Sequence, residues 1–214
     1  MALAAHSTVI KASGTAVPIT AEATTSLGGN VYQITTASRR VIDPSVAVVV
    51  NDGGVPIAAT GYTFDYLFGK ASLTAPPGGA VTVNASYLPM YAVTEVSAFS
   101  CAWSLDLSDV TSFDSGGARK KLGALKDGSG SVTMFASPLV DVDTGAGGTQ
   151  SLHSWLAAGT PRLIESLFGS TYYFRAWVLF ESLEAGAAVA DLAQFTMAYQ
   201  FAAQASGAAA GFGT

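Results

Sequence analysis

Hydrophobic residues alternate with polar or small ones through much of the chain, and this period of two constrains the fold most. Successive side chains of a β-strand point to opposite faces, so the alternation predicts strands with one buried face. It is clearest over residues 81–87, 98–107 and 194–201. Residues 172–180 are apolar on both faces except for Arg175, which is typical of a strand covered on both sides. We therefore expect a mainly β protein.

Turn signals separate the expected strands. Asn51-Asp52-Gly53-Gly54 follows an apolar run and offers the residues that tight hairpins need at positive φ. Phe68-Gly69 separates two further short strands. Pro76-Pro77-Gly78-Gly79 cannot lie within a central strand, because proline lacks the N–H that a ladder requires.

One short helix is expected near residues 151–158. Leu152, Trp155 and Leu156 recur with helical spacing, and Thr149 or Ser151 can cap the start. Gly159 and Pro161 end it.

A boundary is expected near Leu88-Pro89-Met90, where short strands with frequent turns give way to the longest alternating strand. We expect a smaller N-terminal β module over residues 1–89 and a β-sandwich or barrel domain over 90–204. Residues 205–214 are rich in Ala and Gly and are expected to form a flexible tail. The alternative is a single continuous sandwich, since β-sandwiches reach this length as one domain.

The composition indicates a chain that buries part of its surface against other chains. Only 12% of residues are charged and 50% are apolar, whereas a soluble monomer needs a charged surface. The alternative is a monomer whose surface is rich in small residues, because 23 Gly and many Ala inflate the apolar share. The net charge of −5, with no basic run longer than 119–121, argues against a protein that grips DNA.

The cysteine count and the lengths of the apolar runs indicate the compartment in which the chain assembles. Cys101 is the single cysteine, so no intrachain disulfide can form, which fits assembly in a reducing cytoplasm. No basic start followed by an apolar run predicts a signal peptide, and no stretch of about 18 apolar residues predicts a membrane span.

No constellation of residues predicts an enzyme, a cofactor or a metal. Asp143-Thr144-Gly145 resembles the catalytic turn of retroviral-type aspartic proteases, but the partner strand of those enzymes is missing. Asp141 and Asp143 are spaced like the start of a calcium loop that lacks its Gly and its final Glu. His6 and His153 lie far apart without a cysteine cluster, which argues against zinc.

One segment stands apart, from Asp109 to Asp127. A loop of this length without structure of its own is unusual in a compact domain, so it is either disordered or ordered by a partner. Its charged residues are Asp109, Asp114, Arg119, Lys120, Lys121, Lys126 and Asp127.

Three stretches in order resemble the tail tube proteins of siphophages. Residues 95–113 resemble the first long strand of that family and the loop after it. Residues 128–135 and 191–201 are similar to its next strand and its closing strand. In the N-terminal half, residues 32–35, 40–44 and 61–70 resemble segments of other phage structural proteins.

The resemblance implies a non-enzymatic structural subunit that forms hexameric rings, whose inner sheets join into a channel. Rings of that family stack along a tape measure protein, meet tail terminator and distal tail proteins, and pass the genomic DNA. The subunit would be assembled in the host cytoplasm and reside in the virion tail. By the same match, Asp109 to Asp127 would be an arm that reaches a neighbouring subunit or ring.

A channel that passes DNA should not grip it, so its lining is expected to be neutral or acidic. The small polar faces of two predicted strands are candidate linings: Thr94, Ser100 and Ser104, and Gln194, Thr196 and Gln200. Two alternatives stay open. One is another phage or phage-like structural part, such as a tail terminator, a capsid decoration protein or a secretion-tube subunit. The other is a sugar- or host-binding β module, which would need exposed aromatic residues on its loops.

Overall fold

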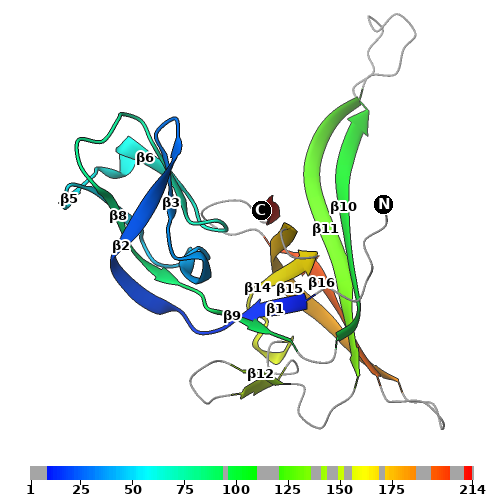
Figure 1. Ribbon diagram of the computed structural model, residues 1–214. Coiled ribbons are helices and arrows are strands. Elements are labelled where there is room, and N and C mark those ends of the chain that lie inside the picture. Colours follow the sequence, from blue (N-terminus) through cyan, green and yellow to red (C-terminus); the bar gives the residue numbers. More distant parts are fainter. Residues whose placement is uncertain are drawn as a thin grey trace, which may run out of the picture.

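The chain folds into two large antiparallel sheets and a small two-stranded one, as the computed structural model shows (Figure 1). The structure describes residues 9–93, 96–109, 121–135, 141–143, 149–151, 156–168, 172–186, 194–202 and 210–213. The mainly β fold class and the short helix are confirmed: within these ranges, residues 156–158 are α-helical and nearly all other regular structure is strand.

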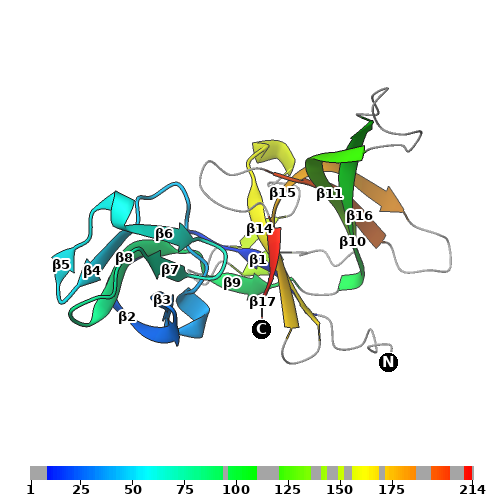
Figure 2. The same ribbon diagram turned by 90° about the horizontal axis from the view of Figure 1, so that it is seen from above.

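The larger sheet has eight strands in the order β10-β11-β16-β15-β14-β1-β9, with β17 also pairing with β15. Its strands are β1 (Val9–Ser13), β9 (Met90–Ala92), β10 (Val96–Asp109), β11 (Lys121–Phe135), β14 (Arg162–Phe168), β15 (Tyr172–Gly186), β16 (Gln194–Phe201) and β17 (Ala210–Gly213). The sheet curls into a half-barrel, so β1 and β14 face β11 and β16 across one apolar core (Figure 2).

The smaller sheet has seven strands in the order β5-β4-β8-β2-β3-β7-β6. Its strands are β2 (Val17–Gly28), β3 (Val31–Ile34), β4 (Val49–Asp52), β5 (Val55–Pro56), β6 (Tyr62–Asp65), β7 (Lys70–Leu73) and β8 (Val81–Tyr87). The 3-10 turns η2 (Ala37–Arg39) and η3 (Ala59–Gly61) connect strands within it. This sheet and its connections, residues 17–88, are called the N-terminal module below. A separate two-stranded sheet pairs β12 (Asp141–Asp143) with β13 (Thr149–Ser151).

The turn expected at Asn51-Asp52-Gly53-Gly54 is confirmed as the hairpin between β4 and β5. Gly53 and Gly54 have φ of 56° and 85°, the left-handed region that glycine adopts without strain. The Asp52 carboxylate fixes the turn to the Pro- and Gly-rich loop, because its two oxygens accept the N–H groups of Gly78 and Gly79 at 2.8 and 2.6 Å. The loop expected to interrupt the strands therefore stabilises a neighbouring hairpin.

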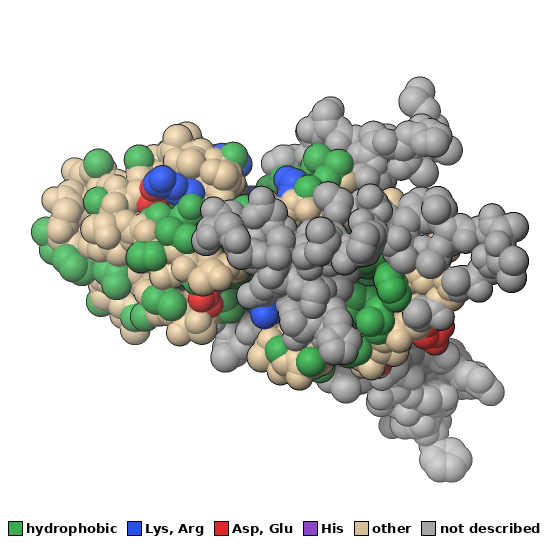
Figure 3. Space-filling view, turned by 90° about the horizontal axis from the view of Figure 1, so that it is seen from below, with side chains coloured by type: hydrophobic (Ala, Val, Ile, Leu, Met, Phe, Trp, Pro, Cys, Tyr) green, Lys and Arg blue, Asp and Glu red, His purple; other side chains and the backbone are tan. Residues whose placement is uncertain are grey.

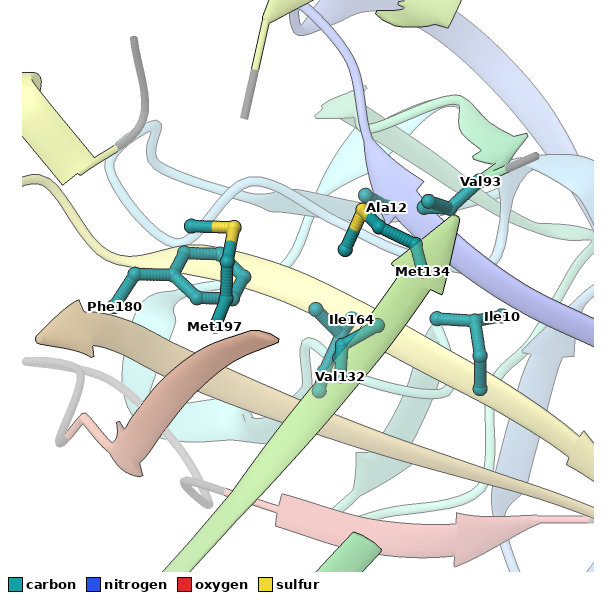
Figure 4. A pocket seen from close by; sticks show the side chains of 8 residues that line it. All are labelled: Ile10, Ala12, Val93, Val132, Met134, Ile164, Phe180 and Met197. Atoms are coloured by element: carbon teal, nitrogen blue, oxygen red, sulfur yellow. The ribbon is translucent and has the colours of Figure 1, made fainter. Parts of the chain in front are cut away.

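The core of the larger sheet lies between its two halves. Ile10 and Ala12 from β1 and Ile164 from β14 meet Val132 and Met134 from β11. These side chains surround a cavity of only about 10 Å³ that is lined by apolar groups alone (Figure 4). Such close packing contributes about 25 cal/mol for each Å² of apolar surface removed from water.

The N-terminal module is inserted between two neighbouring strands of the larger sheet. The chain leaves at the end of β1 and returns at the start of β9, and these strands pair with each other. The Gly14 N–H donates to the Pro89 carbonyl at 2.8 Å, and this hydrogen bond holds the two segments that connect the module to the larger sheet side by side. β1 thus belongs to the larger sheet although its residues precede the module.

The module packs against the larger sheet through a third apolar cluster. Val41, Leu67 and Phe68 of the module contact Leu163 of β14 and Trp177 of β15. This cluster is separate from the core of either sheet and joins the module to the larger sheet.

A buried ion cluster lies beside this apolar contact. Arg175 donates to the Glu165 carboxylate at 2.8 Å, and Lys11 donates to the same carboxylate at 2.9 Å. Arg175 also donates to the backbone carbonyl of Leu67, and its guanidinium lies 5.6 Å from the Phe68 ring centroid. The one charged residue in the expected doubly covered strand is therefore paired, as a buried charge must be.

Three sequence expectations need correction. The expected loop from Asp109 to Asp127 begins and ends in strand, because Lys121 to Asp127 belong to β11 and pair with β10. The expected flexible tail includes β17, which pairs with β15 beyond the end of β16. Thr149 and Ser151 lie in β13, so neither is a helix cap; residues 152–155 lie outside the described residues. Gly159, with φ of 58°, ends the helix as expected.

Substitution of Gly130 tests how the strands of the larger sheet are held together. A Cβ at Gly130 would collide with the Tyr199 ring, which crosses the glycine, and with the Ser100 carbonyl. We expect Gly130→Ala to lower the free energy of unfolding by about 1–3 kcal/mol, the usual cost of overpacking, in urea titrations. Gly186→Ala is the control, since a Cβ there meets nothing within 4 Å. Equal stability of the two variants would contradict the packing described.

Acid sensitivity tests the ion cluster. Burial opposes ionisation of Glu165, but Arg175 and Lys11 outweigh burial and lower the pKa of its carboxyl below the ordinary 4.5. A lowered folded-state pKa gives stability that is present above pH 4.5 and lost as pH falls through the folded-state pKa. Thermal unfolding of the wild type should therefore shift to lower temperature below pH 4.5.

We expect Glu165→Gln to cost about 3–5 kcal/mol at pH 7, because it leaves the buried Arg175 without its counterion. The variant should also lose that part of the acid sensitivity. The exposed Glu181→Gln is the matched control and should change stability by less than about 0.5 kcal/mol. A small effect of Glu165→Gln at pH 7 would exclude a structural role for the cluster.

Candidate functional site

The outer face of one half of the larger sheet carries a continuous set of small and polar side chains, called the polar face below. Ser100 of β10 lies opposite Ser131 of β11, and Ser131 lies opposite Ala198 of β16. Residues two positions apart on each strand share this face. Its described small and polar members are Ala98, Ser100, Ala102, Ser129, Ser131, Thr133, Gln194, Thr196, Ala198, Gln200, Ser182 and Glu184, and the exposed Leu179 lies opposite Gln200 on the same face. None of them is buried.

Hydrogen bonds join neighbouring strands across the polar face. The hydroxyls of Ser100 and Ser131 lie 2.9 Å apart, and those of Thr133 and Thr196 lie 3.1 Å apart. The Gln200 amide donates to the Glu181 carboxylate at 2.8 Å. These side-chain bonds link β10 to β11, β11 to β16 and β16 to β15.

The charge of the polar face is negative. Glu184 is a member, the Glu181 carboxylate reaches the face through Gln200, and Asp127 shares the orientation of Ser129 on β11. No Lys or Arg occurs among the described side chains of this face. The described charged groups on this face are therefore carboxylates.

The opposite face of the same strands is apolar and fixes their arrangement. Tyr199 is fully buried, crosses Gly130 and donates its hydroxyl to the Ser100 carbonyl at 2.7 Å. Burial, together with the nearby Cys101, raises the pKa of the Tyr199 phenol, so the hydroxyl stays protonated and remains a donor. One side chain thereby ties three strands together beneath the polar face.

The four strands that carry the polar face end in two open edges. β10 pairs only with β11, so its other side has no partner among the described residues. β14 pairs with β15 only as far as Val178, so the side of β15 from Leu179 to Gly186 that faces away from β16 is also unpaired in the described chain. Such edges offer N–H and C=O groups to another strand.

The hairpin of β10 and β11 projects beyond the rest of the sheet (Figure 1). β16 pairs with β11 only from Ser129 onward, so Ser104–Asp109 and Lys121–Asp127 pair only with each other among the described residues. With 14 and 15 residues, the two strands are each about 45–50 Å long at about 3.3 Å per residue.

The structure brings most of the predicted lining residues together. Ser100, Gln194, Thr196 and Gln200 lie on the polar face. Ser104 belongs to β10, its side chain is not described, and Thr94 lies outside the described residues. Ser129, Ser131 and Thr133 also lie on this face and were not predicted, although they alternate with Gly130, Val132 and Met134 in the same way.

The residues of the predicted arm divide between strands and the undescribed part of the chain. Asp109 lies at the end of β10, directly opposite Lys121 at the start of β11, and Lys126 and Asp127 follow on β11. Asp114, Arg119 and Lys120 lie outside the described residues.

The residues weighed for catalysis do not converge where the chain is described. Asp141 and Asp143 lie in β12, while Thr144, Gly145, His6 and His153 are outside the described residues. In the described ranges no three His, Cys, Asp or Glu side chains gather as a metal site would require. None of the helices described has the length and apolar character needed to cross a membrane.

Neither a protein family nor a curated protein matches the sequence. The solved structures with similarity to this chain include two from gene transfer agent particles. One is a chain of the "Virion of native gene transfer agent (GTA) particle", with 17% identity and a TM-score of 0.45 over 58% of this chain and 89% of that one. The other is a chain of the "Tail of empty GTA particle computed with helical refinement, C6 symmetry", with 17% identity and a TM-score of 0.45 over 59% and 87%. Similarity at this level does not carry a function from one chain to another.

Paired substitutions of adjacent residues test the sidedness of this sheet. Thr196 lies on the polar face, whereas Met197 is fully buried in the core. We expect Thr196→Ala to change the free energy of unfolding by less than about 1 kcal/mol, because its hydroxyl bond is partly exposed. Met197→Ala should cost about 2–5 kcal/mol, measured in the same urea titrations. The reverse order of the two effects would place the core on the other face.

Proposed function

We propose that this chain is a structural subunit of a phage tail tube, in which hexameric rings stack into a channel for the genome. The observation that carries the proposal is a four-stranded antiparallel sheet with a bare polar face and an open edge at each end. The number six and the tail come from the resemblance of residues 95–113, 128–135 and 191–201 to siphophage tail tube proteins.

The two open edges are complementary. β10, β11, β16 and β15 alternate in direction, so the first and last strands run oppositely. If β10 of one copy meets Leu179–Gly186 of the next, the joint is antiparallel and continues the alternation. A head-to-tail contact of this kind forms a ring when its rotation closes. Closure also removes the edges that would otherwise promote aggregation.

The polar face suits the lining of a channel that conducts DNA. Most of its side chains are short, and its charge is negative where it is described. Binding to the phosphate backbone needs clustered Lys or Arg. A genome would therefore pass this surface without being held by it.

The projecting hairpin supports the proposed arm between subunits. Both strands are bare on their outer sides beyond Ser129, so a neighbouring subunit or ring can pair with them. The arm we propose comprises Asp109 to Asp127. Tape measure, tail terminator and distal tail proteins are the further partners that the tail assignment implies, and the virion tail is the implied location.

A second candidate is another phage or phage-like structural subunit, such as a tail terminator or a secretion-tube protein. The same open edges would serve a single ring as well as a stacked tube. Negative-stain microscopy of the purified protein separates these cases. Stacked tubes with a central hole support the tail tube, and single rings support the second candidate. Monomers that persist at high concentration would refute both.

Charged substitutions on the edge strand test the joint. Ala98 and Ala102 are exposed on β10, at the first open edge, and Lys side chains on an edge strand block pairing with another strand. We expect the double variant Ala98→Lys and Ala102→Lys to keep the unfolding temperature of the free subunit but to form at least tenfold fewer rings by microscopy. Val55→Lys in the N-terminal module is the matched control, since Val55 is 67% exposed and lies on β5, an edge strand of the other sheet.

Normal rings from the double variant would exclude β10 as part of the joint. Loss of rings in the Val55→Lys control would show that added charge alone prevents assembly.

A further inference from the structure

We propose that the N-terminal module forms the outer wall of the ring, on the side away from the channel, and takes no part in closing the ring. This inference rests on the function proposed above. It assigns a role to residues 17–88: each copy displays them outward, where any molecule that binds the tube wall meets them first.

The layering of the larger sheet sets the direction of its polar face. Side chains of β1 and β14 meet those of β11 and β16 around one apolar cavity (Figure 4). On β11, Val132 and Met134 point into this core, so Ser131 and Thr133 point away from it. The polar face therefore looks away from β1 and β14.

The module lies on the other side of the same core. On β14, Ile164 points into the core while Leu163 points outward into the cluster with Val41 and Leu67. On β15, Phe174 points into the core, whereas Trp177 points outward into the cluster with the module. The order of layers is thus module, β14, core, β11 and polar face, and Figure 2 shows the module and β10–β11 at opposite ends of the molecule.

Two attachments to the larger sheet keep the module on this side of the core. The chain leaves and returns at one point, where Gly14 donates to Pro89 at 2.8 Å. The apolar cluster and the bond from Arg175 to the Leu67 carbonyl hold the module at a second place. Two separated attachments prevent a rigid body from swinging toward the channel.

Neither open edge belongs to the module. β10 and the Leu179–Gly186 part of β15 both belong to the larger sheet, and the latter begins two residues beyond Trp177, where the contact of β15 with the module ends. Ring closure through these edges therefore leaves the module surface uncovered. That surface is mostly polar with scattered hydrophobic side chains and few charges, as Figure 3 shows for one side, and the hairpin tips carry Val55 at 67% and Leu27 at 53% exposure.

Cysteine labelling of assembled protein tests the inference with the full-length chain. Cys101→Ser gives a background without the natural thiol. Val55→Cys then places a thiol on the module, and Ser129→Cys places one on the polar face, where residue 129 is exposed in the free subunit. The probe is a maleimide on a gold particle wider than the central hole seen by microscopy. A small maleimide on dissociated subunits confirms that both thiols react.

We expect gold along the whole wall of Val55→Cys tubes and at least tenfold less on Ser129→Cys tubes. Gold along the wall of Ser129→Cys tubes, or its absence from Val55→Cys tubes, would overturn the inference while leaving the ring intact. If the unsubstituted protein forms neither rings nor tubes, the proposed function fails, and the outward module fails with it.

Discussion

The packing of β1 and β14 against β11 and β16 is the contact on which the other features depend. It curls the larger sheet, and curling is what gives one sheet two outer faces that look in opposite directions. One outer face is left polar and bare, whereas the other is covered by the N-terminal module. Without the shared core between them, the two faces would belong to one flat surface, and an open flat sheet of this size would aggregate through its edges.

Much of the local structure was predictable from residue patterns. The alternation in residues 81–87 and 194–201 identifies β8 and β16, because a half-buried strand repeats every two residues. The same alternation placed Ser100, Thr196 and Gln200 on the exposed side, and pairing then brought them to one face. Local turn chemistry likewise located the hairpin at Gly53-Gly54. The division of the chain at residue 89 into separate domains stays a prediction.

Pairing between distant segments was not predictable. β1 reads as part of the N-terminal half but pairs with β14, whose residues lie some 150 positions later. The sequence of Lys121–Asp127 predicted part of a charged loop. These residues instead form a strand, because they pair with β10. The composition of residues 205–214 predicted a flexible tail, but residues 210–213 form β17. A Cβ added at Gly211 would come within 2.9 Å of Phe68, and composition cannot predict so close an approach. The sequence shows Arg175 as the one charged residue in an apolar stretch. Its partner, the Glu165 carboxylate, lies on a different strand, so the ion pair was not predictable.

The long separation of β1 from β14 has a consequence for synthesis on the ribosome. Ser13 accepts the N–H of Leu163 in the finished fold, 150 residues downstream. At about 5–20 residues per second, that partner emerges roughly 8–30 seconds after β1. The whole module emerges in that interval, and it can form its own sheet and core, since all seven of its strands pair with one another. Until then β1 can pair only with β9, and its edge toward β14 stays open, so the nascent chain must be kept from pairing this edge with another copy.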